Sequence, residues 1–200
     1  MKWSDITVFQ FQKIAKYIDE PDSLERETKL ISAITGLTVN EVELLPLDIY
    51  REHKKNIAFI NEPIEGEKVK VLTVNGRRYK AIYDMRKINT ARYIETKVFA
   101  SNVIENLHKI AASMFHPLKF TIIGWREDVY DPSKHEEYSQ DMLEAKFLNV
   151  YFSVVFFYHV YKLWIGASMD YLIKELEMMG KEREIKELRS FLNIMDGSIL

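Results

Sequence analysis

The fold is set by residues 69–83, VKVLTVNGRRYKAIY, in which Asn75-Gly76 separates two runs rich in β-branched and aromatic side chains. An Asn-Gly pair between such runs predicts a two-residue β-hairpin turn, because both turn residues must accept a positive φ. A two-stranded hairpin alone is only marginally stable in water. It therefore has to pack on helices, recruit a third strand or pair with another chain, and the one obvious internal candidate strand is Phe120-Thr121-Ile122-Ile123.

The chain before the hairpin carries signals for the ends of short helices. Thr7 with Gln10, and Thr38 with Glu41, have the spacing of a capping box, in which each side chain bonds the backbone N–H of the other residue. Gly36 is suited to the left-handed position just after a helix. We therefore expect helices that start after Thr7 and Thr38, and a helix between them that stops at Gly36.

Residues 61–67, NEPIEGE, have the proline, glycine and charge content of a connection. Before it, Pro46 ends the third helix and Asp48 is expected to cap a fourth, which runs to about Asn61. The chain thus divides into a helical N-terminal region, 1–62, and a β-hairpin plus helical core, 68–200, which can still form one continuous domain.

Helical spacing returns after the hairpin. Asn89 or Thr90 can cap one helix, and a second is expected over 101–115, ended by Pro117. The segment 124–132 reads as irregular. The longest helical region is expected to begin at Asp131-Pro132-Ser133.

Residues 147–165 are apolar on nearly every side of a helix, and such a helix must be surrounded. The stretch is about as long as a membrane span. However, His159 and Lys162 fall inside it, and a central charge opposes insertion by roughly 2.5–3.5 kcal/mol. We therefore predict no membrane span but a buried central helix, covered by two further helices whose apolar residues are Tyr171, Leu172 and Leu176, and Ile185, Leu188, Leu192 and Met195.

These patterns together predict a mainly α protein with a small antiparallel β-hairpin (α+β) and a helical, bundle-like C-terminal core. The composition narrows the function. The 28 basic residues are interleaved with 30 acidic ones for a net charge of −2, so the chain lacks the basic footprint of a nucleic-acid-binding protein. It contains no cysteine, which excludes disulfides and thiolate chemistry, and its N-terminus lacks the apolar core of a signal peptide.

No motif in the sequence reads as an active site, so no catalytic, cofactor-binding or metal-ligating residues are assigned and the protein is not expected to be an enzyme. One alternative is a helical metalloenzyme that uses the E-x-x-H pair Glu105 and His108, although ferritin-like sites need a second such pair. Another is a nucleic-acid-binding module on the hairpin, with three basic residues and a tyrosine for base stacking: Arg77, Arg78, Lys80 and Tyr79.

The aromatic content favours contacts between proteins, because aromatic side chains bury large areas and dominate interfaces. The same residues can equally belong to the core. The candidate interface residues are Phe9, Phe11, Tyr79, Tyr83, Tyr151, Phe152 and Trp164.

Residues 27–48 follow a pattern of helix, Ile34-Thr35-Gly36-Leu37, helix and a leucine-to-aspartate ending at Asp48. This pattern resembles phage tail assembly chaperones. Residues 73–79 and 91–95 are similar to small proteins encoded among the head and tail genes of Bacteroidetes phages, including crAss-like phages. The two resemblances cover roughly the first half of the chain.

The resemblance implies a non-enzymatic virion or morphogenesis protein that acts through protein–protein contacts, as a structural component or as an assembly chaperone. The implied partners are other phage structural proteins, from the tail, the portal or the head-tail junction, together with further copies of the chain itself. The implied location is the virion or the host cytoplasm. The long aromatic C-terminal region departs from the chaperone pattern and favours a lasting structural interface.

Overall fold

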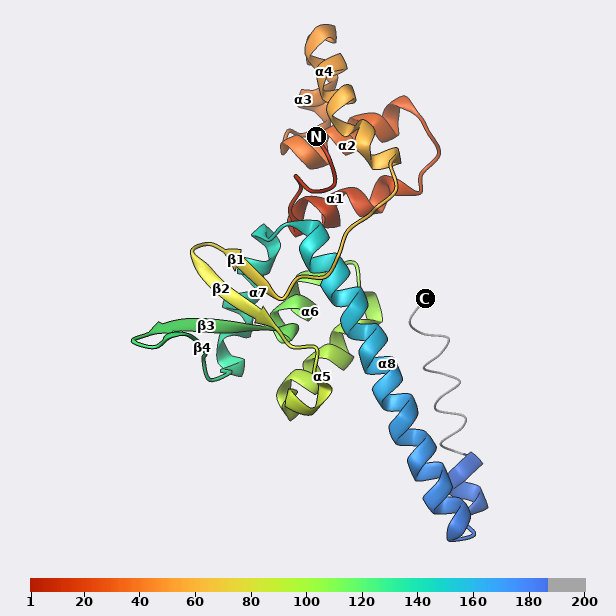
Figure 1. Ribbon diagram of the computed structural model, residues 1–200. Coiled ribbons are helices and arrows are strands. Elements are labelled where there is room, and N and C mark those ends of the chain that lie inside the picture. Colours follow the sequence, from red (N-terminus) through yellow and green to blue (C-terminus); the bar gives the residue numbers. More distant parts are fainter. Residues whose placement is uncertain (187–200) are drawn as a thin grey trace.

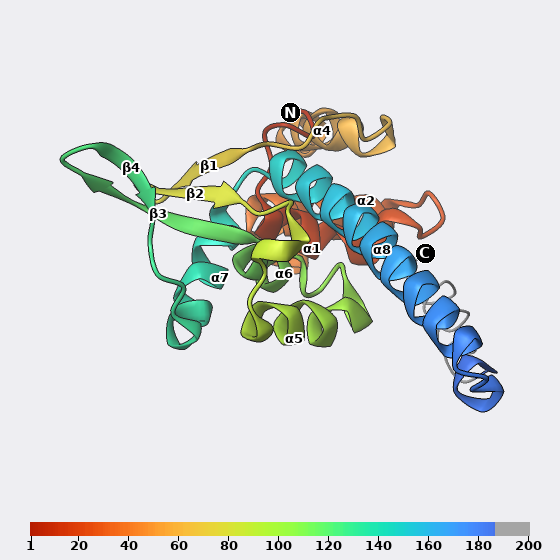
Figure 2. The same ribbon diagram turned by 60° about the horizontal axis from the view of Figure 1, so that its bottom comes forward.

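The computed structural model, which describes residues 1–186 (at residues 165 and 169 the backbone only), combines helices with a four-stranded antiparallel sheet (Figure 1). The α+β prediction is confirmed. Four short helices lie at one end of the molecule, the sheet projects to one side, and one long helix extends away on the other (Figure 2).

The N-terminal helices begin and end largely where their capping residues predict. Both capping boxes form, at Thr7 and at Thr38, and Gly36 adopts a left-handed φ of 82°. The prediction for Asp48 is wrong, because Pro46 occupies the N-cap without a side-chain hydrogen bond and Asp48 lies inside the first turn. The elements are α1 (Val8–Ile18), α2 (Leu24–Thr35), α3 (Val39–Glu43), α4 (Leu47–Ile57) and the 3-10 helix η1 (Ala58–Asn61).

The predicted hairpin forms, with Asn75 at φ 49° and Gly76 at φ 75°. Two more strands extend it into a sheet in the order β1-β2-β3-β4, built from β1 (Val71–Val74), β2 (Arg77–Ala81), β3 (Phe115–Thr121) and β4 (Gly124–Glu127). The third strand is therefore longer than predicted. It begins at Phe115, and Ile122 and Ile123 form the turn that follows it. The next strand, β4, lies within the segment 124–132, which was expected to be irregular.

The central helix is α6 (Leu107–Met114), which contacts α1, α5, α7, α8 and β3. Five of its side chains, among them Leu107 and Ile110, are at most 1% exposed. It starts later than predicted, because the preceding residues form the 3-10 helix η3 (Ala100–Asn102) and turns. Around it lie η2 (Met85–Lys87), α5 (Thr90–Phe99), η4 (Pro132–Lys134) and α7 (His135–Glu144).

The long helical region is two helices, α7 and α8 (Phe147–Met178), separated by extended backbone at Ala145. The break is fixed by the N-terminus, because Ala145 and Phe147 exchange backbone hydrogen bonds with Val8 and Ile6. The residues expected on a separate helix, such as Tyr171, continue α8. Leu188, Leu192 and Met195 lie outside the described residues.

The prediction of a fully surrounded central helix is wrong for α8. One face of its first half is buried as far as Tyr161, although Val155 and His159 are exposed, and beyond that Leu163, Tyr171 and Met178 are exposed. By length and composition alone α8 is long and apolar enough to cross a membrane, and 35% of its most apolar window is buried within the chain. The helix therefore offers solvent an apolar surface along its second half.

One hydrophobic core connects the two predicted regions. The rings of Phe11 on α1 and Phe147 on α8 stack with centroids 3.8 Å apart, and Trp3 packs against both. The connection over 61–67 crosses this junction, where the Trp3 indole donates a hydrogen bond to the carbonyl of Glu62. The chain on either side of the connection thus shares its aromatic core.

Candidate functional site

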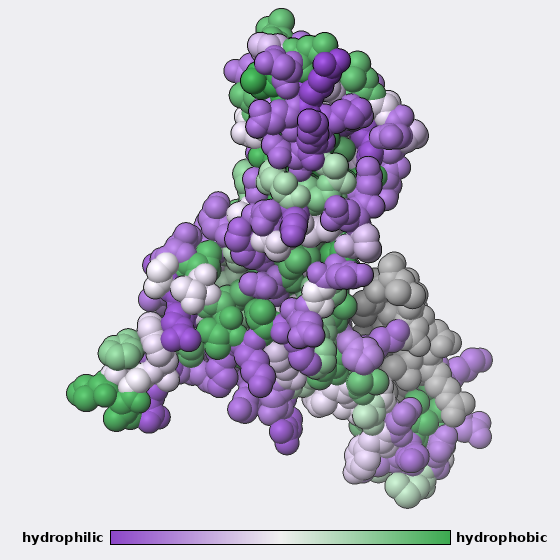
Figure 3. Space-filling model, turned by 45° about the horizontal axis from the view of Figure 1, so that its top comes forward, coloured by the Kyte–Doolittle hydropathy of each residue, from purple (hydrophilic) through white to green (hydrophobic). Residues whose placement is uncertain are grey.

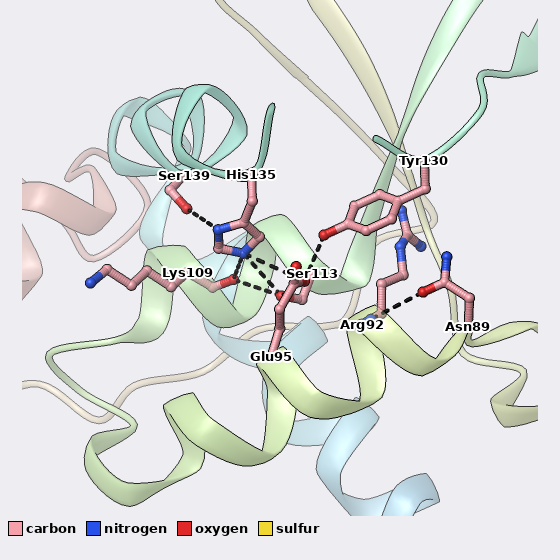
Figure 4. Close-up of polar contacts among 8 residues, drawn as sticks. All are labelled: Asn89, Arg92, Glu95, Lys109, Ser113, Tyr130, His135 and Ser139. Carbon is pink, nitrogen blue, oxygen red and sulfur yellow. Dashed lines mark hydrogen bonds and ion pairs between the residues drawn. The ribbon is translucent and has the colours of Figure 1, made fainter. Parts of the chain in front are cut away.

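A partly buried polar cluster lies between α5, α6 and α7 (Figure 4). The carboxylate of Glu95 accepts hydrogen bonds from the hydroxyls of Ser113, at 2.8 Å, and Tyr130, at 2.6 Å. His135 places its Nε2 atom 3.0 Å from the Ser113 hydroxyl and 3.1 Å from the carbonyl of Lys109. Burial, followed by the Glu95 contact, raises the pKa of Tyr130.

The serine, histidine and glutamate of this cluster are the residue types of a hydrolase triad, but their hydrogen bonds connect them differently. In a triad the imidazole accepts the serine proton and the carboxylate holds the other ring nitrogen. Here the carboxylate of Glu95 accepts a hydrogen bond directly from the Ser113 hydroxyl, and Nδ1 of His135 lies 3.4 Å from the Ser139 hydroxyl. Ser113 and Ser139 are also buried, at 3% and 0% exposure. This cluster joins three helices and gives a substrate no access to a nucleophile.

Arg92 on α5 lies beside the cluster, and it is 1% exposed. Its guanidinium group stacks over the Tyr130 ring at 4.0 Å, and none of its side-chain nitrogens has a hydrogen-bond partner within residues 1–186. Desolvation lowers the pKa of Arg92, while the nearby charge of Glu95 opposes that shift. The cation–π contact and this carboxylate are what stabilise the buried charge.

The basic hairpin residues are occupied by contacts within the chain. Arg77 pairs with Glu137 and Asp141, and Lys80 pairs with Glu127 at 2.6 Å. Tyr79 is fully buried, and Arg78 lies over the Trp125 ring. The arrangement does not offer the free cations and the exposed ring that a nucleic-acid-binding hairpin requires.

The E-x-x-H pair does not lie on one helix face. Glu105 precedes α6 and accepts a hydrogen bond from Asn102, whereas His108 is in the helix and contacts the Gln12 side chain at 3.0 Å. Within residues 1–186 no group of three or more histidine, aspartate and glutamate side chains is placed to hold a metal ion.

Two surface features among the described residues are apolar, and the first is a projecting turn. The β3–β4 turn projects from the body and carries Phe120 at 72% exposure, Ile122 at 105%, Ile123 at 72% and Trp125 at 44%. We call these four residues the apolar tip. It is the hydrophobic group at the left extremity of the molecule in Figure 3.

A second apolar feature lies where the connection runs along α8. A groove of about 420 Å³ is formed there by Gly66, Glu67, Lys68, Phe152, Val155, Phe156 and His159, and we call it the linker groove. Gly66 approaches the Phe152 ring so closely that an added Cβ would lie 2.7 Å from it. At this contact the connection and α8 meet on one side of the groove.

The structure separates the predicted interface residues into three groups. Phe11 and Tyr79 are buried in the core and cannot serve as surface anchors in this conformation. Tyr83, Tyr151 and Phe152 are partly buried, whereas Phe9 and Trp164 are the two that lie on the surface, at 43% and 44% exposure.

Sequence reasoning missed the apolar tip. The available signal was the pair Ile122-Ile123 directly before Gly124, which has a positive φ of 100° and closes the turn. Because this pair was assigned to the candidate strand 120–123, its exposure in a turn was not expected.

The fold and these surfaces define a class: an α+β protein whose described residues expose apolar surfaces and partly bury their polar cluster. Searches of family models, of curated proteins and of solved structures give no match to this chain.

Proposed function

We propose that this protein is a non-enzymatic bacteriophage virion or morphogenesis protein that acts through protein–protein contacts in head-tail or tail assembly. The resemblance of residues 27–48 and 73–79 to phage assembly proteins supports the phage context. The apolar tip carries the contact part of the proposal.

Four bulky apolar side chains at the end of a projecting hairpin are a costly arrangement in water, at about 25 cal/mol per Å² of exposed apolar surface. Beside the turn, Phe120 and Trp125 pack edge to face across the two strands with centroids 5.3 Å apart. A pre-ordered apolar projection with an aromatic pair is the kind of anchor that fills a pocket on a partner protein. The exposed second half of α8 supplies further apolar area.

The test combines two measurements. Mass spectrometry of purified virions decides whether the protein stays in the particle, and co-expression with phage tail or portal proteins followed by size-exclusion chromatography with light scattering decides whether it forms complexes. We expect a complex with at least one of these proteins.

The variant Ile122→Ser/Ile123→Ser should abolish that complex without affecting the fold, because both side chains point to solvent. Leu44→Ser is the matched control, since Leu44 is 83% exposed and lies on the N-terminal helices. A protein that is absent from particles and binds none of the structural proteins would overturn the proposal.

A further inference from the structure

The neck of the apolar tip carries two basic residues directly opposite each other. Lys119 on β3 and Arg126 on β4 are register partners, one step before the Phe120 and Trp125 pair. Like charges at directly opposite positions destabilise a sheet. Lys119 is compensated by Asp128 at 2.8 Å, whereas Arg126 forms no ion pair within residues 1–186. The projecting hairpin therefore combines an apolar end with an uncompensated cation at its neck.

The linker groove has the complementary character. Its α8 wall presents Phe152, Phe156 and Val155, the last 48% exposed. Its other wall is the connection, which carries Glu65 and Glu67, both exposed and without an ion pair in the part of the chain that the structure describes. The one cation of the groove, Lys68, is held over the Phe156 ring with its Nζ atom 2.9 Å from the centroid.

Tip and groove lie apart on the same molecule. In both Figure 1 and Figure 2 the β3–β4 turn projects away from α8, and the body of the sheet lies between them. The described part of the chain therefore presents both an apolar projection with the unpaired Arg126 at its neck and an apolar groove with the unpaired Glu67 in its wall, and the projection does not reach this groove within its own molecule.

From this complementarity we propose that the apolar tip of one copy docks in the linker groove of a second copy. The isoleucines of the turn contact the α8 wall, and Arg126 pairs with Glu65 or Glu67 on the connection. The contact is head to tail, so repetition gives a closed ring or an open filament rather than a two-fold dimer. The inference deepens the proposed function, on which it rests for its biological setting, and it names the partner of the apolar tip.

The absence of cysteine allows a direct test by cross-linking the purified chain. Ile122→Cys in one preparation and Val155→Cys in another, distinguished by a size tag, are mixed and oxidised. We expect a disulfide between the two differently tagged chains. Ile122→Cys mixed with Leu44→Cys is the matched control, because Leu44 is exposed but distant from the groove. Equal cross-linking in both mixtures would overturn the proposal.

Charge and apolar variants test the same contact by sedimentation. Ile122→Ser/Ile123→Ser should weaken self-association by roughly a hundredfold, because two large apolar side chains lose their burial. Arg126→Glu should weaken it by about two- to fivefold, the effect of an exposed ion pair, and Glu67→Arg in the same chain should restore the loss. Failure of this charge exchange at both Glu65 and Glu67 would count against the assigned orientation of the contact.

The main competing occupant of a basic, apolar tip is an anionic bilayer. Flotation with phosphatidylserine-containing vesicles addresses it, and a tip-dependent vesicle interaction by a chain that stays monomeric would overturn docking between copies. The outcomes for the two proposals are separable. Self-association by a protein that is absent from virions and binds none of the structural proteins overturns only the phage assignment, and a virion protein whose purified chains do not cross-link overturns only the tip-in-groove contact.

Discussion

The hydroxyl of Tyr79, in the second strand of the hairpin, donates a hydrogen bond to the carboxylate of Asp141 on α7, 62 residues later in the chain. The same carboxylate accepts from the Asn75 amide at 2.9 Å and from the Arg77 guanidinium at 3.2 Å. A single acidic residue thus binds the turn and the following strand to the helix beneath the sheet. Tyr79 also packs edge to face on Tyr138 of α7, so the same tyrosine joins the sheet to α7 through its hydroxyl and its ring.

Asp141→Ala should destabilise the protein by about 3 kcal/mol, because a buried tyrosine hydroxyl and an arginine lose their acceptor together. Urea unfolding followed by circular dichroism measures the change. Asp170→Ala, which removes an exposed aspartate from α8, is the control and should change stability by less than about 0.5 kcal/mol. A similar small effect at Asp141 would mean that the joint contributes little.

The same glycine-to-alanine change should have opposite signs at two positions. Gly76→Ala should destabilise by about 1 kcal/mol or more, because φ is 75° in the turn. Gly166→Ala should stabilise by up to about 1 kcal/mol, because this glycine lies inside α8 and an added Cβ meets no atom within 4 Å. Thermal unfolding of the two variants compares them directly, and equal shifts would contradict the assigned turn geometry.

Glu95→Gln should destabilise by about 2 kcal/mol, because it weakens the acceptor of two hydrogen bonds and removes a carboxylate whose charge favours the buried Arg92 cation. If part of that loss comes from the charge of Arg92, Arg92→Met should lower the free energy of unfolding by less in the Glu95→Gln background than in the wild type. A double-mutant cycle measured by urea unfolding gives this coupling, expected to exceed about 0.5 kcal/mol. Additive effects would show that the two side chains act independently.

Stability should fall steeply above pH 10. Burial raises the pKa of Tyr79, Tyr130, Tyr158 and Tyr161, whereas unfolded tyrosines ionise at about pH 10. Above that pH the folded state therefore holds more protons than the unfolded state. The stability that the buried tyrosines contribute is fully present below pH 10 and is lost as the pH rises.

Ultraviolet titration of tyrosinate tests the alkaline prediction. The exposed tyrosines should ionise in the folded protein, and the buried group should ionise only together with the loss of circular dichroism. Tyr158→Phe should reduce the alkaline dependence, because its ring is 7% exposed and its hydroxyl makes one hydrogen bond, to the Thr96 carbonyl. A single titration of all tyrosines near pH 10 without unfolding would contradict the burial of these rings.

The local features were predictable because they depend on residues close together in the chain. The two capping boxes, the stop at Gly36 and the turn at Asn75-Gly76 all follow from φ preferences and from hydrogen bonds that span three residues or fewer. These signals hold whatever the rest of the fold does.

Apart from the cap at Asp48, the main failures concern the surroundings of a segment. The apolar pattern over 147–165 predicts a helix, but not that its outer face is left uncovered, and Phe120–Ile123 predicts apolar extended chain, but not that its end becomes an exposed turn. The central helix was predicted to be residues 147–165, but α6 takes that place although α8 is the more apolar over its length.

By itself, then, the sequence determined the class of fold, the ends of the early helices and the first hairpin. Tertiary structure alone decided the joint between Tyr79 and Asp141, the enclosure of the Glu95 cluster, and the exposure of the apolar tip. The physical reason is that backbone conformation is fixed over a few residues, whereas burial depends on which distant segments come to lie against a given face.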